Sequence, residues 1–263
     1  MVALEPLQYG LGTLSGGLVG LTLGLFGGGG SILAVPLMVY LVGVPGAHMA
    51  IGTSAVAVAA NAASSLFHHA RHGHVKWRCA LYFSLAGVIG AYIGSTIGKA
   101  IDGQKLLFLF SILMLAVAVL MFRGRADRGR AGMECTPDRL PKVMGFGAGT
   151  GMLSGFFGIG GGFLIVPGLI ASTGMPILNA IASSLVAVAA FGLTTALNYA
   201  RSGYVDWPLA LVFVGGGVLG GMLGARLARR LSARKGSLNM GFAALVVLVA
   251  VYMLVRSAAG PSG

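Results

Sequence analysis

Long apolar runs, separated by short polar stretches, follow one another along almost the whole chain. Five runs fall in each half, and their lengths predict helices that cross or enter the hydrocarbon layer of a membrane, which is about 30 Å thick. The second run of each half has only 14 residues. The runs cover residues 7–25, 31–44, 47–68, 79–98 and 105–122, then 143–157, 162–175, 177–200, 208–228 and 237–255.

The two halves of the chain are copies of one unit. With an offset of 131 residues, 16–36 matches 147–167 at 10 of 21 positions, and with an offset of 130, 50–77 matches 180–207 at 13 of 28 positions. Phenylalanine, proline, arginine and tryptophan are in register, which an Ala/Gly/Val-rich composition alone does not produce. We therefore predict two membrane repeats joined by a basic cytoplasmic linker, with boundaries at 7–122, 123–142 and 143–256.

Composition supports a membrane protein. Of the 263 residues, 56% are hydrophobic and 9% are charged, whereas a soluble domain carries about 25% charged residues. A net charge of +12 would suit a nucleic-acid partner, but the basic residues lie in short loops between apolar runs, where the positive-inside rule places them. We predict an all-α integral membrane protein surrounded by a lipid bilayer, and no nucleic-acid partner.

The same basic residues predict how the repeats face. If the glycine-broken pairs of runs, 7–44 and 143–175, each return to their starting side, the two units are inverted. Loops 71–78, 123–142 and 226–235 then share the cytoplasmic side and carry 14 of the 18 Lys and Arg residues. If each pair crosses only once, the units are parallel and the split is 11 to 7. The first split agrees better with the positive-inside rule, so we predict inverted repeats. Whether each pair is re-entrant, crosses twice or crosses once stays open.

A glycine run interrupts each unit in the middle of its apolar sequence. Such runs do not hold a regular helix well, and broken helix at membrane depth is tolerated where protein buries it or where it lines a wet cavity. The helix that restarts has free N–H groups and a positive dipole end, which bind anions. The alternative is that the glycines only allow close helix crossing. The candidate substrate-binding residues are Gly27, Gly28, Gly29, Gly30, Ser31, Gly158, Gly160, Gly161 and Gly162.

The long run that follows each glycine pair carries polar residues. Thr53 and Ser54 recur as Ser183 and Ser184, and we add these four to the substrate-binding set because hydroxyls in a pore can donate to an oxyanion. The alternative is that they bond their own backbone or a neighbouring helix. Further polar residues on these runs are Asn61, Ser64, Ser65, Thr194, Thr195 and Asn198.

Arginine recurs at the end of each of these runs, as Arg71 and Arg201. Each is a candidate pore-mouth residue that recruits anions, or an arginine that snorkels to the membrane surface. A histidine cluster lies beside the first of them, without a carboxylate or cysteine in an ordered spacing. We expect it to be solvated rather than to bind a metal. Its members are His68, His69, His72 and His74.

Acidic residues are confined to loops and tails. Proton- and cation-coupled carriers usually keep an ionisable residue inside the bundle, and no such carboxylate occurs here. This absence favours an anion path, through which an inside-negative potential drives anions outward with about 2.3 kcal/mol per charge per 100 mV. The six acids are Glu5, Asp102, Asp127, Glu134, Asp138 and Asp206.

Taken together, these motifs resemble the sulfite exporter TauE/SafE family. The resemblance rests on Phe-Gly-x-Gly-Gly…Pro at 26–36 and 157–167, Ala-Arg-x-Gly-x-Val-x-Trp at 70–77 and 200–207, and the basic central loop. It covers about residues 10–256 and implies a bacterial or archaeal inner-membrane permease for sulfite, sulfoacetate or related anions.

We therefore expect a transporter, an exporter of a small sulfur-containing or other oxyanion, that is not an enzyme and uses no cofactor or metal. An intramembrane enzyme would need a nucleophile–base pair or a metal triad in the bundle, and the sequence offers neither. The alternative function is a membrane assembly or sensor subunit that transports nothing. A homodimer is one assembly that the sequence allows.

Overall fold

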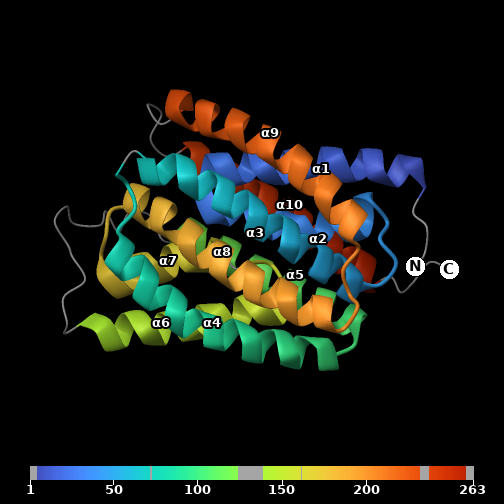
Figure 1. Cartoon of the computed structure of the whole chain (residues 1–263), viewed down its shortest axis with the longest axis horizontal. Coiled ribbons are helices and arrows are strands. Elements are labelled where there is room, and N and C mark those ends of the chain that lie inside the picture. Colours follow the sequence, from blue (N-terminus) through green and yellow to red (C-terminus); the bar gives the residue numbers. More distant parts are fainter. Residues whose placement is uncertain (1–4, 72, 124–138, 161, 232–236, 259–263) are drawn as a thin grey trace.

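Helices follow one another along the chain where the apolar runs predict them (Figure 1). The computed structural model describes residues 5–71, 73–123, 139–160, 162–231 and 237–258, and no strand occurs among them. The first half contains α1 (Pro6–Phe26), the 3₁₀ helix η1 (Gly27–Leu33), α2 (Ala34–Pro36), the π-helix η2 (Leu37–Leu41), α3 (Ala47–Arg71), α4 (Trp77–Ala100) and α5 (Gly103–Arg123). The second half contains α6 (Leu140–Phe157), α7 (Gly162–Thr173), α8 (Ile177–Arg201), α9 (Trp207–Leu231) and α10 (Ser237–Ala258).

The helices have the lengths and composition of membrane spans, which confirms the all-α membrane prediction. Among the described residues, four helical segments are long and apolar enough to cross a bilayer, and others are apolar but shorter. The four are Ala47–Arg71, Trp77–Ala100, Asn179–Arg201 and Trp207–Gly224, and the shorter ones are Gly30–Leu41, Gly103–Val119, Gly162–Thr173 and Val246–Arg256. The predicted linker lies mostly at 124–138, outside the described residues.

Each glycine-broken pair of runs folds back to the end of the bundle at which it starts. In the first half, Gln8 Nε2 near the start of α1 donates to the carbonyl oxygen of Val42, after η2, at 3.2 Å. In the second, Arg139 Nη1, just before α6, donates to the carbonyl oxygen of Thr173 at 2.8 Å. The two donors, Gln8 and Arg139, are 131 residues apart, as are the two acceptors, Val42 and Thr173, and 131 is the offset between the repeats. Both pairs are therefore hairpins closed by the same kind of bond at corresponding positions.

The central helices α3 and α8 lie side by side and run in opposite directions (Figure 1). Asp206 N–H, beyond the end of α8, donates to Thr53 Oγ1 near the start of α3 at 3.0 Å. Lys76 N–H, beyond the end of α3, donates to Ser183 Oγ near the start of α8 at 2.9 Å. The offset of 130 relates these two bonds, so the halves contact each other through corresponding residues.

The turns after α3 and α8 are also alike. Each helix is followed two residues later by a glycine with positive φ, Gly73 at 70° and Gly203 at 75°. This left-handed conformation terminates a helix at little cost only in glycine. The chain then reverses and begins the next helix at Trp77 or Trp207.

Glycine ridges hold the outer helices together. Helix α1 packs along α9, and α6 packs along α4. A Cβ added at Gly20 would overlap the carbonyl oxygen of Gly217, and one added at Gly151 would overlap that of Gly87. These backbones approach as closely as small-residue packing in lipid allows. The alternative role of glycine, close helix crossing, therefore applies to α1 and α6 themselves.

Candidate functional site

The glycine break of the second half lies between the two central helices. After α6 the chain turns through Gly158 and Gly160, whose φ values are 67° and 65°, and α7 begins at Gly162. A Cβ at Gly160 would lie 2.7 Å from Val58 Cγ1 and 3.4 Å from Val188 Cγ1. These valines are each the twelfth residue of a 25-residue helix, α3 or α8. The break therefore lies halfway along the bundle.

The break of the first half has a different backbone. Its glycines continue the chain as the 3₁₀ helix η1, and only three α-helical residues precede the π-helix η2. Gly30 packs back onto α1, where Thr22 Oγ1 donates to its carbonyl oxygen at 3.3 Å. Because a 3₁₀ helix uses its N–H groups in i→i+3 bonds, η1 does not present the restarted α-helical N-terminus that α7 presents.

The two broken segments nevertheless meet, because α7 packs against η1. Ser31 is buried there, as are Gly158, Gly160 and Gly162. Gly161 and the surroundings of Gly27, Gly28 and Gly29 lie outside what the structure describes. Gly30 and Ser31 thus belong to a segment that packs against α7, which begins at Gly162. The proline after each break lies differently: Pro36 immediately precedes η2, whereas Pro167 lies inside α7.

Of the recurring hydroxyl residues, Ser54 lies on α3 between Ile51 and Val58, the two residues that face Gly158 and Gly160 of the break. Thr53 and Ser183 accept the backbone bonds that join the halves, whereas Ser54 Oγ donates to Ile51 O at 3.0 Å and Ser184 Oγ donates to Ile181 O at 2.8 Å. All four side chains are buried. Since α3 and α8 are antiparallel, the two pairs lie in opposite halves of the bundle, and the structure does not bring them together.

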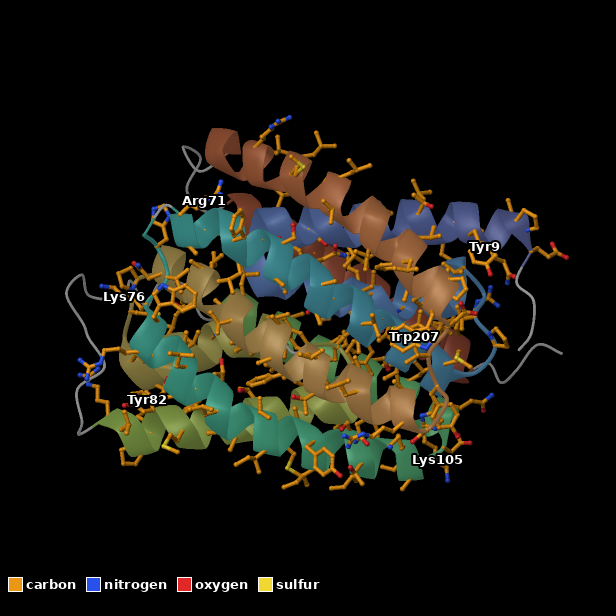
Figure 2. All side chains as sticks on the ribbon, viewed as in Figure 1. Tyr9, Arg71, Lys76, Tyr82, Lys105 and Trp207 are labelled. Carbon is orange, nitrogen blue, oxygen red and sulfur yellow. The ribbon has the colours of Figure 1, made fainter. Side chains whose placement is uncertain are left out.

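The two recurring arginines lie at opposite ends of the bundle because they end antiparallel helices. Figure 2 shows Arg71 and Lys76 at one end and Lys105 and Trp207 at the other. Both arginines are exposed. The guanidinium carbon of Arg71 lies 4.1 Å from the centre of the Phe67 ring, a cation–π contact that holds it along α3.

A small cleft between α1, α3 and α9 is a feature that sequence reasoning missed, although it had named the polar residues that line it. It is lined by Asn61, Ser64, Ser65 and His69 of α3, with Gly24 of α1 and Gly217 of α9 among the surrounding small residues. The side chain of Asn61 is only 2% exposed, and neither its Nδ2 nor its Oδ1 has a hydrogen-bond partner. One signal was available: Asn61 aligns with Phe191 in the second repeat.

The other buried asparagine of the central helices has a contrasting environment. Asn198 of α8 accepts from Lys99 Nζ through its Oδ1 at 2.8 Å and donates from Nδ2 to Ser95 Oγ at 2.6 Å. Lys99 also donates to Ser202 Oγ at 2.8 Å. This network joins the ends of α4 and α8, and its bonds account for both polar atoms of Asn198.

The histidine cluster is described only in part. The rings of His69 and His74 lie 6.5 Å apart between centres. Residue His72 and the side chain of His68 lie outside the described part of the chain. Asn179 Nδ2, near the start of α8, donates to the His74 carbonyl oxygen at 2.9 Å. The described histidines therefore lie where the turn after α3 meets α8.

Comparison with known proteins gives a consistent result. The model of the family described as sulfite exporter TauE/SafE matches residues 12–253. The chain is 57% identical over 244 residues to a probable membrane transporter protein of Xylella fastidiosa, covering 92% of this chain and 94% of the relative. A similarly named protein of Methanocaldococcus jannaschii is 30% identical over 211 residues, covering 75% and 78%, and one of Haemophilus influenzae is 29% identical over 260 residues, covering 92% and 97%. No solved structure gives a significant match.

Proposed function

The chain belongs to the sulfite exporter TauE/SafE family of membrane transporters. From this premise we propose that it exports a small oxyanion, sulfite or an organosulfonate such as sulfoacetate. The membrane would be the inner membrane of a bacterium or archaeon. The centre of the bundle supports an anionic substrate, because helix α7 begins there and none of the described carboxylates lies there.

Two of the described acids cap the starts of helices. Asp102 Oδ1 accepts the N–H groups of Gln104 and Lys105 at the start of α5. Asp206 Oδ1 accepts the N–H of Leu209 at the start of α9. Carboxylates at helix starts complement the helix dipole. Those that cap helices in this way are not placed to bind a cation at mid-membrane.

The break before α7 supplies the polar groups that an anion needs. Helix α7 has 12 residues, and the N–H groups of its first turn have no acceptor within the helix. It begins beside Gly160, between the midpoints of α3 and α8. An anion held there would interact with backbone N–H groups and a positive dipole end without any charged side chain.

The proposal is tested by measuring flux in proteoliposomes that contain only this protein. Uptake or release of sulfite, sulfoacetate, thiosulfate and sulfate is compared under imposed membrane potentials of both signs. We expect potential-dependent flux of at least one sulfur oxyanion. No flux of any of the four, from protein shown to be folded, would refute the sulfur-anion assignment.

A glycine pair provides the matched variants for this assay. Gly160→Val is expected to abolish flux, because φ is 65° there and a side chain would collide with Val58. Gly149→Ala on α6 is the control, since nothing lies within 4 Å of its added Cβ. Equal flux by both variants would show that the break is not part of the path.

A further inference from the structure

The small cleft between α1, α3 and α9 carries its polar side chains in a row along α3. Along α3, Asn61, Ser65 and His69 are spaced by four residues, which places them on one face of the helix. Arg71 ends the same helix at the surface (Figure 2). Asn61 is residue 15 of the 25 in α3, so its amide lies just short of the midpoint of the helix when reached from the Arg71 end.

The amide of Asn61 has no partner in the protein. Both its polar atoms are buried without a hydrogen bond, and the group packs so closely on α9 that a Cβ at Gly217 would overlap it. Buried polar groups are almost always hydrogen-bonded, because leaving water without a new partner is costly. An unpaired amide at the inner end of the cleft therefore points to a ligand from outside the protein.

The second repeat shows that packing does not require a polar residue here. The offset of 130 relates Asn61 to Phe191 and Gly217 to Gly87. A Cβ at Gly87 would overlap the Phe191 ring, so the phenylalanine occupies the slot that the asparagine occupies in the first repeat. Phe191 is fully buried. The space beside the glycine is thus filled by an apolar ring at Gly87 and by an unpaired amide at Gly217.

The lining also indicates the charge of the ligand. Among glycines, Val218 and Met222, its polar groups are an amide, two serine hydroxyls and a histidine ring, and it contains no carboxylate. Such groups can donate hydrogen bonds. A small oxyanion matches these donors, whereas a metal cation would find no anionic ligand.

We infer that this cleft is a half-channel, in which Asn61 donates a hydrogen bond to the transported oxyanion at the inner end. The oxyanion enters from the end of the bundle that carries Arg71, and Phe191 closes the corresponding route in the second repeat. The inference deepens the proposed anion transport and depends on it for the identity of the ligand. The existence of a water-filled cleft can be tested without that identity.

The first experiment measures access to the cleft. Cysteine replaces Ser65, Thr195 and Lys76 in turn in a chain whose native Cys79 and Cys135 are changed to serine. A membrane-impermeant, negatively charged methanethiosulfonate is added to right-side-out and inside-out vesicles, with the cysteine-free chain as the background. Thr195 is the repeat-related counterpart of Ser65 and is fully buried, whereas Lys76 is exposed at the Arg71 end.

We expect S65C to react only from the side on which K76C reacts, and T195C to stay unmodified from both sides. Failure of S65C to react, or its reaction from the opposite side, would overturn the half-channel.

The second experiment measures anion flux by N61L. Leucine has the same number and branching of side-chain heavy atoms but no polar atoms, and it leaves no protein group without a partner because Asn61 has none. We expect sulfite or sulfoacetate flux to fall about tenfold or more, as loss of a hydrogen bond to a charged group implies. The unfolding temperature should stay the same or rise.

The matched control is S84A on α4. Like N61L it removes a buried polar group that has no partner, here a hydroxyl that lies outside the cleft. Its flux should equal that of the parent. Parental flux by N61L would overturn the role of Asn61. A parent that carries none of the anions would refute the proposed substrate, whereas the labelling experiment would still decide whether the half-channel exists.

Discussion

Two side-chain hydroxyls in this bundle form hydrogen bonds with backbone groups that are more than 100 residues away in the sequence. The hydroxyls of Thr53 and Ser183 each accept a backbone N–H from the turn after the opposite central helix. A buried N–H that loses its acceptor costs more than the net gain of one hydrogen bond. At these two positions the structure shows a role in stability, and contact with substrate stays a prediction.

Replacing Thr53 by valine tests the structural role. T53V keeps the shape of the side chain but leaves the N–H of Asp206 without its acceptor, so we expect a loss of about 1–3 kcal/mol in the free energy of unfolding. S183A should give a similar loss, because Lys76 N–H is stranded in the same way. Denaturant unfolding in detergent measures both.

The exposed Thr13 is the control for these two variants, since its hydroxyl donates to the Tyr9 carbonyl of its own helix. T13A should change the unfolding free energy by less than about 0.5 kcal/mol. If T53V and S183A are as stable as T13A, the two bonds contribute nothing measurable.

The two buried asparagines make a second residue-scale prediction. N198L removes a donor and an acceptor that serve Ser95 and Lys99, and the buried groups left behind should cost about 1–3 kcal/mol. N61L removes no bond and should be neutral or stabilising. Thermal unfolding of the two variants in one detergent compares them directly, and a greater loss in N61L would mean that Asn61 has a structural partner.

Between elements, glycine determines how closely helices approach. Helices α1 and α9 cross with backbone against backbone, as do α6 and α4. Because a single methyl group has no room at these crossings, the helix pairs must separate to accept one. Glycines on the outer face of the same helices have open space beside them and are free of this constraint.

Helix α6 offers matched glycines for a test. G151A should destabilise the protein by about 1–3 kcal/mol or more, because the Cβ would meet the backbone of Gly87. G145A, six residues earlier on the same helix, meets nothing within 4 Å and should gain up to about 1 kcal/mol from its better helix propensity. The unfolding temperatures of the two variants should therefore move in opposite directions.

For the molecule as a whole, the antiparallel packing of α3 and α8 places the two recurring arginines at opposite ends of the bundle. The turns after α3 and α8, with Arg71 and Arg201, lie at opposite ends of the bundle. Inverted repeats require this arrangement across the bilayer, whereas parallel repeats would place both turns on the same side. The orientation in the membrane stays a prediction from the positive-inside rule.

Two cysteines, introduced one at a time into the chain that lacks Cys79 and Cys135, decide this topology. With an impermeant thiol reagent, K76C should be labelled from the cytoplasmic side and R201C from the opposite side. Labelling of both from one side would favour parallel repeats. Their labelling in detergent-solubilised protein is the control for reactivity, since both positions are exposed.

The sequence by itself determined the class of the protein, the helices and the duplication. Apolar runs are local and long, so run 79–98 could be placed within α4 without knowledge of its neighbours. The matched motifs identified α3 and α8 as equivalent helices, and the distribution of charge favoured hairpins that return to their starting side. Each of these inferences depends only on which residues occur within a short stretch.

Only the tertiary structure decided which polar groups are paired. Thr53 finds its partner 153 residues away and Ser183 finds its partner 107 residues away, and Asn61 remains unpaired although Asn198 does not. The glycine runs align in sequence, yet one forms a 3₁₀ helix and the other a turn with positive φ. Hydrogen bonding and backbone conformation at these sites depend on the helices packed around them, which a local pattern does not specify.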